Sequence, residues 1–124
     1  MPPRADQAYL WLSPNWAAWL EFGGGNNRDH FVEITERLCK EFGATITERL
    51  PDPTDVRGKE YLSLTIDGRP FLLMRGPPPW GTALSGQRGD TEFMIRIGRA
   101  FGVQRFRGWR WRLFWACRWV RGQR

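Results

Sequence analysis

Residues 59–75 read KEYLSLTIDGRPFLLMR, and this stretch decides the fold class. Its first part, residues 59–66, alternates apolar and polar side chains, which is the period of a strand with one buried face. Asp67-Gly68 then supplies the positive φ angles that a type I′ turn requires. Residues 71–75 are apolar again and return as the partner strand. The stretch therefore predicts an antiparallel β-hairpin.

Two helices are predicted, one on each side of this hairpin in the sequence. The first covers residues 28–42 and ends before Gly43, since glycine suits the left-handed position after a helix. The second covers residues 92–101 and ends before Gly102. Each carries one apolar stripe at spacings of three and four, the pattern of a helix that packs one face on a core. The stripes are Phe31, Ile34, Leu38 and Phe42 in the first helix, and Phe93, Ile97 and Phe101 in the second.

Other segments complete the expected sheet. Residues 44–50 form a short strand, and residues 82–85 could add a further extended piece. Residues 16–22 (WAAWLEF) alternate like a strand, although helix start and stop signals flank them. We favour the strand and leave the helix open. The order β-α-β-β-β-α then predicts an α+β domain, a single mainly antiparallel sheet with two helices on one face.

The last twenty residues, 105–124, carry the net charge of the protein. They read RFRGWRWRLFWACRWVRGQR, with seven arginines, no acidic residue and four of the eight tryptophans. The preceding residues hold 12 basic and 13 acidic side chains. We therefore divide the chain into an α+β domain (1–104) and a basic aromatic tail (105–124).

The conformation of this tail stays open between three alternatives. As a strand, it places its tryptophans on one face, which tryptophan tolerates well. As a helix, it forms two apolar stripes: Phe106, Trp109, Leu113, Cys117 and Val120, and separately Trp111, Trp115 and Trp119. As a third alternative it is disordered until it binds. We favour the strand because its period sorts the tryptophans more cleanly.

Several classes of protein are disfavoured by composition. Two cysteines, Cys39 and Cys117, cannot build a disulfide framework, so we expect both to be reduced in a cytoplasmic protein. The N-terminus lacks the pattern of a secretory signal. No run reaches the ~18 apolar residues of a membrane-spanning helix, so we do not expect this chain to be an integral membrane protein.

Signatures of catalysis are sparse. The single histidine, His30, is expected to be a solvated side chain in the first turn of its helix. One histidine and two distant cysteines give no recognised metal-ligand spacing. Ser85 lacks the first glycine of a nucleophile elbow, and the glycine-rich residues 23–27 lack the lysine of a phosphate-binding loop. We therefore expect no enzyme, no metal and no cofactor.

Four short segments between residues 16 and 103 carry a resemblance. They are Trp19-Leu20-Glu21-Phe22, the helix exit Phe42-Gly43-Ala44 leading into Glu48-Arg49-Leu50, Leu64-Thr65-Ile66-Asp67-Gly68, and Ile97-Gly98-Arg99-Ala100-Phe101-Gly102. Together they resemble small uncharacterised bacterial domains of β-α-β-β-β-α order, some of them kin to toxin-immunity proteins. The resemblance implies a stoichiometric binding role. None of the segments is a catalytic motif, and the basic tail departs from the resemblance.

The first functional hypothesis is a small non-enzymatic protein-binding module of immunity or inhibitor type. Its exposed sheet face or its loops would dock another protein. We place its partner contacts on Arg75 and Trp80, because arginine and tryptophan dominate the energetics of protein interfaces.

The second hypothesis is an anionic-surface binder that acts through the tail on nucleic acid or on a membrane surface. Arginine pairs with phosphate, whereas tryptophan stacks on bases and lies at membrane interfaces. A tail packed on the sheet, or a homodimer formed through its tryptophans, remains an alternative. The expected anion-binding residues are Arg105, Arg107, Trp109, Arg110, Trp111, Arg112, Trp115, Arg118 and Trp119.

Overall fold

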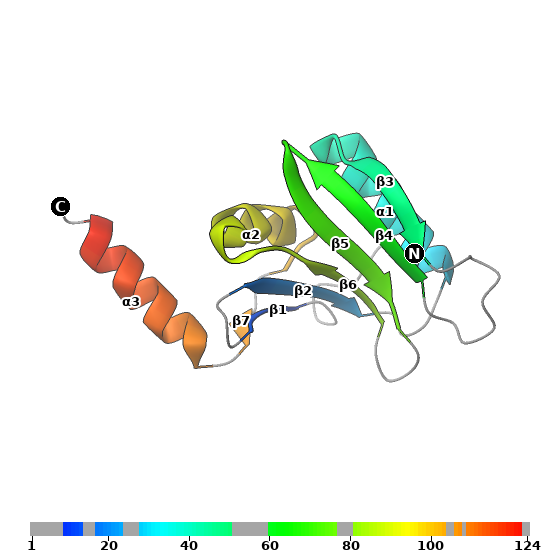
Figure 1. The fold of residues 1–124 in the computed structure, drawn as a ribbon. Coiled ribbons are helices and arrows are strands. Elements are labelled where there is room, and N and C mark those ends of the chain that lie inside the picture. Colours follow the sequence, from blue (N-terminus) through cyan, green and yellow to red (C-terminus); the bar gives the residue numbers. More distant parts are fainter. Residues whose placement is uncertain are drawn as a thin grey trace.

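The protein folds as one seven-stranded sheet with two helices on one side of it and a third helix that extends away from its edge (Figure 1). The computed structural model describes residues 9–13, 17–23, 28–50, 60–76, 81–103, 106–107 and 109–122. The predicted α+β class and the mainly antiparallel sheet are confirmed. None of the described helices is long and apolar enough to cross a membrane.

The described chain contains more strands and helices than predicted. They are β1 (Tyr9–Leu12), β2 (Ala18–Gly23), α1 (Arg28–Phe42), β3 (Thr45–Leu50), β4 (Glu60–Ile66), β5 (Arg69–Arg75), β6 (Thr82–Ser85), the 3-10 turn η1 (Arg88–Asp90), α2 (Thr91–Ala100), β7 (Phe106–Arg107) and α3 (Arg110–Gly122). Across the sheet the strand order is β3-β4-β5-β6-β2-β1-β7. Neighbouring strands are antiparallel except β1 and β7, which are parallel.

The predicted hairpin is the centre of one half of the sheet. β4 and β5 pair along their whole length, from Glu60 opposite Arg75 to Ile66 opposite Arg69. Between them Asp67 and Gly68 have φ angles of 53° and 75°, the left-handed values that the type I′ turn requires. β6 then pairs with β5 on the other side, so that β5 is an interior strand.

The core lies between one face of the sheet and the two helices α1 and α2. Phe31, Ile34 and Leu38 from α1 and Met94, Ile95 and Ile97 from α2 pack on the buried side chains of the strands, Leu10, Leu12, Ala18, Leu20, Phe22, Leu62, Leu64, Ile66, Phe71, Leu73 and Leu84. Phe22 of β2 meets Phe101 edge to face, with ring centroids 4.9 Å apart. α1 and α2 thus pack on the same face of the sheet, whereas the predicted number of two helices is wrong, since α3 is a third.

The predicted order β-α-β-β-β-α is incomplete, and the tail is not the favoured strand. β1 was not expected, whereas the favoured strand at 16–22 corresponds to β2 and the extended piece at 82–85 is β6. Among the described residues of the tail, Phe106–Arg107 is the extended part, and Arg110–Gly122 forms the helix α3. Residues 110–122 form a helix rather than a strand, and this helix directs Trp111 into the core, where its side chain is only 3% exposed. The domain boundary at residue 104 stays a prediction.

Candidate functional site

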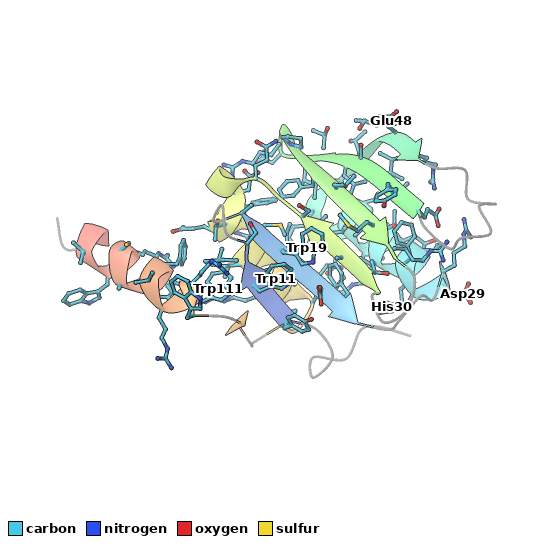
Figure 2. The ribbon with its side chains drawn as sticks, turned by 60° about the horizontal axis from the view of Figure 1, so that its bottom comes forward. Trp11, Trp19, Asp29, His30, Glu48 and Trp111 are labelled. Carbon is cyan, nitrogen blue, oxygen red and sulfur yellow. The ribbon has the colours of Figure 1, made fainter. Side chains whose placement is uncertain are left out.

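The face of the sheet opposite α1 and α2 carries no helix of the described chain. Figure 2 shows Trp11 and Trp19 side by side on this face, over β1 and β2. They are cross-strand partners with ring centroids 5.6 Å apart. The indole Nε1 of Trp19 donates a hydrogen bond to Oε1 of Glu21 at 3.2 Å. The hydrogen bond ties the Trp19 ring to the carboxylate beside it.

Two rows of cross-strand partners run across this face, one through Trp11 and Trp19 and one beside it. We call the two rows together the open face. The first row is Trp11, Trp19, Ser85, Leu72, Ser63 and Glu48, and the second is Tyr9, Glu21, Ala83, Met74 and Tyr61. The aromatic and larger apolar members are half-buried by their neighbours, and Glu48 is exposed. Glu21 and Glu48 are the charged residues of these rows among those whose side chains the structure describes, and this part of the open face is apolar with a negative charge. At the sheet edge Trp11 also pairs with Arg107 of β7, whose side chain is not described.

Arg75, a predicted partner contact, lies on the helix side of the sheet and is buried. Its Nη2 is 3.2 Å from Oε1 of Glu60, which also lies 3.5 Å from Nε of Arg28. The prediction of Arg75 as an accessible partner contact is contradicted by this burial, because β6 pairs along β5 and makes β5 an interior strand. Trp80, the second predicted contact, lies outside the described residues.

His30 also differs from the prediction of a solvated side chain. It is buried in the first turn of α1, because this end of the helix packs closely on the sheet. The fold thus places both His30 and Arg75 away from any exposed binding surface.

A cavity of about 570 Å³ opens between α1 and the strands β3 and β4. Apolar side chains of Phe31, Val32 and Ile46 form much of its wall, together with the thiol of Cys39 and the carboxylate of Glu60. Glu60 is already paired with arginine, and Cys39 is a free cysteine, as Cys117 is. We see no nucleophile and base held together in this cavity.

The tail residues do not form one surface. Trp111 is buried and its Nε1 donates a hydrogen bond to the backbone oxygen of Leu10 at 3.1 Å. Trp115 stacks on Trp111, with centroids 6.4 Å apart, and Phe114 meets Trp111 edge to face. These two rings attach α3 to the body. Burial of Trp111 argues against the predicted role of its ring in anion binding, whereas the predicted role of half-buried Trp115 stays a prediction.

The remaining predicted tail residues differ in exposure. Trp109, Arg112 and Trp119 are exposed, and Arg110 is half-buried with its guanidinium 5.0 Å above the ring of Trp109. Arg118 is paired with Glu92 of α2 at 3.1 Å. Arg107 belongs to β7, although its side chain is not described, and Arg105 lies outside the described residues.

Comparison with known proteins does not assign the chain to a family. A scan against family models and searches of curated proteins and of solved structures found no match. The resemblance to toxin-immunity kin therefore stays a prediction. Among the described residues, no group of three or more histidine, cysteine or acidic side chains is placed to hold a metal ion.

Trp11 and Trp19 were not among the predicted site residues, although both left a signal in the sequence. Tyr9–Leu12 alternates aromatic and leucine residues, as a strand with one buried leucine face does. In β2, Trp19 occupies the alternate position to the buried residues Ala18, Leu20 and Phe22 and so points to the other face. Each tryptophan thus lies opposite to the buried residues of its own strand, and the pairing of β1 with β2 brings both to one face.

Proposed function

We propose that the protein is a non-enzymatic binding module that docks another protein on its open face, in the manner of an immunity or inhibitor protein. The observation that supports this is the row of tryptophan, tyrosine, leucine and methionine on a sheet face that no described helix covers. Tryptophan and tyrosine are enriched where protein interfaces gain most of their energy.

The size of the open face suits a stable complex. Its first row crosses six strands, from β1 to β3, and so spans roughly 24 Å at the usual strand spacing. A standard protein interface buries about 800 Å² on each partner. The two rows can form the centre of such an interface, and the residues around them on the sheet complete its area.

Rigidity favours binding as well. The strands that carry the open face are held from below by fully buried Leu20, Leu62, Leu73 and Leu84. Half-buried neighbours restrict the rotamers of Trp11 and Trp19. Side chains that are already ordered lose little conformational entropy on binding, which leaves more of the interaction energy as affinity.

Charge defines the chemistry of the partner. Among the side chains that the structure describes, the rows carry two charged groups, Glu21 and Glu48, which lie near opposite ends. Arg107 of β7 pairs with Trp11 at the sheet edge, and its side chain is not described. The complementary surface is an apolar patch bordered by basic side chains. Such complementarity acts mainly on association rate and specificity.

The proposal is tested by comparing variants in affinity capture from the native host, followed by calorimetry with the purified partner. Trp11→Ser with Trp19→Ser should weaken binding by roughly 30-fold or more, as loss of an interface hot spot does. Glu21→Lys with Glu48→Lys keeps the apolar rows and should lower the association rate. Trp119→Ser on α3 is the matched control and should bind like the wild type.

Two results would contradict the proposal. Both open-face variants could bind the partner with wild-type affinity, or the Trp119→Ser control could lose binding to the same extent as they do. Circular dichroism of each variant shows beforehand that the fold is retained.

A further inference from the structure

The side of α3 that faces away from the body is apolar, and we call Trp109, Leu113, Cys117 and Val120 its outer face. Their spacings of four, four and three residues align them along one side of a helix. All four are exposed, with Trp109 at 62%, Leu113 at 45% and Val120 at 55%. A helix at a protein surface normally presents polar side chains there, so the outer face requires a partner.

Arginines flank the outer face. Arg110 lies one turn before Leu113 along one side, and exposed Arg112 lies on the other side with Trp119, which is 66% exposed. No acidic residue occurs between residues 105 and 124. The helix thus combines an apolar stripe, a cationic border and tryptophans at the boundary, as interfacial helices do.

The same geometry argues against single-stranded nucleic acid. Binding of a single strand requires a series of aromatic rings free to stack. Trp111 and Trp115 are packed against each other and the body, which leaves Trp109 and Trp119 exposed, on different sides of the helix. The outer face instead offers the aliphatic side chains of Leu113 and Val120, which gain energy in an acyl environment rather than on bases.

We infer that α3 binds the surface of a bilayer rich in anionic lipid, with the outer face in the headgroup–acyl boundary and the arginines at the phosphates. Trp111 and the Arg118–Glu92 ion pair hold the other side of the helix on the body. Because α3 extends away from the sheet edge (Figures 1 and 2), the open face stays uncovered. The membrane contact therefore goes beyond the proposed protein binding and is compatible with it.

The test is cosedimentation of the full chain with vesicles of phosphatidylcholine containing phosphatidylserine, and with vesicles of phosphatidylcholine alone. Binding should be confined to the anionic vesicles and weaken as salt is added. Arg110→Gln with Arg112→Gln should lower the partition coefficient about tenfold or more, since each basic side chain at an anionic surface contributes about 1 kcal/mol, a factor of about five. Leu113→Ser with Val120→Ser should lower it by roughly tenfold or more.

The matched control is Arg96→Gln with Arg99→Gln, which removes the same charge from exposed positions of α2. It should change the partition coefficient by about twofold at most, because neither arginine borders the outer face. A dye on Cys117, in a Cys39→Ala background, should shift its emission to the blue on anionic vesicles. The same dye on Arg99→Cys, with both Cys39 and Cys117 replaced by alanine, should not respond.

Other occupants of the outer face give distinct results. Tighter binding to a single-stranded oligonucleotide than to anionic vesicles would overturn the inference in favour of nucleic acid. Dimerisation in ultracentrifugation that Leu113→Ser with Val120→Ser abolishes, without vesicle binding, would assign the face to a second copy. Equal binding by the α3 variants and the α2 control would also overturn it.

Discussion

The indole nitrogen of Trp111 lies 3.1 Å from the backbone oxygen of Leu10, which joins the last helix to the first strand across 101 residues of sequence. The ring belongs to the same core as the side chains of α1 and α2. α3 is therefore attached to the folded body by a buried contact, while its outer face remains exposed.

Replacing Trp111 should destabilise the whole protein. Trp111→Ala should lower the free energy of unfolding by about 3–5 kcal/mol, as loss of a buried tryptophan does. Trp111→Phe keeps most of the ring but loses the hydrogen bond, and should cost more than the roughly 1 kcal/mol of that bond alone. Urea unfolding measures both. Trp119→Ala, at an exposed position of the same helix, is the control and should leave the midpoint unchanged.

The buried ion pair of Glu60 and Arg75 predicts strong coupling between two substitutions. Glu60→Leu alone leaves the Arg75 charge buried beside Arg28 without its main counterion and should cost about 3–5 kcal/mol. Arg75→Met alone should cost a similar amount. The double variant should recover much of the loss, since an apolar pair can replace a buried ion pair. Independent, additive effects in a double-mutant cycle would show that the pair is not formed.

Two glycines should respond in opposite directions to alanine. Gly43 has a φ angle of 68° after α1, so Gly43→Ala should cost about 1–2 kcal/mol through backbone strain. Gly98 lies inside α2, where an added Cβ would meet Leu20 and Val103 at ordinary contact distances of 3.6 Å. Gly98→Ala should therefore stabilise the protein by roughly 0.5–1 kcal/mol. Equal shifts of the two unfolding midpoints would contradict both backbone assignments.

Glu41 should make a small, pH-dependent contribution to stability. The hydrogen bond from Arg37, 2.7 Å between Nε and Oε2, lowers the pKa of Glu41 below its usual value. A lowered carboxyl pKa stabilises the fold above the ordinary pKa, and the contribution disappears as the pH falls through the lowered one. Glu41→Gln should thus be less stable than the wild type near neutral pH and equal to it in acid. A difference that persists in acid would have another cause.

The sequence predicted the elements whose signals are local. The hairpin, α1 and α2 each combine a clear period with a stop or turn residue, so their ends agree with the structure within one or two residues. β1 and β7 have four and two residues, too few for a period to be recognised. Their place depends on pairing with distant segments.

Residues of the site were harder to predict because their surroundings are set by long-range contacts. In the tail, both a strand and a helix would place tryptophans together on one face, so the local pattern fits either. The contact of Trp111 with Leu10, distant in sequence, favours the helix. Burial of Arg75 follows from the pairing of β5 with β6, which no local pattern reveals. Exposure of Trp11 and Trp19 on one face follows from the pairing of β1 with β2.

Crosslinking from the middle of the open face tests the central proposal most directly. A photoreactive p-benzoylphenylalanine at Leu72, activated in the native host, should join the protein to a partner of different sequence. The same group at exposed Arg99 on α2 is the control and should give no such adduct. Absence of an adduct from Leu72, or an equal yield of the same adduct from Arg99, would contradict a binding role for the open face.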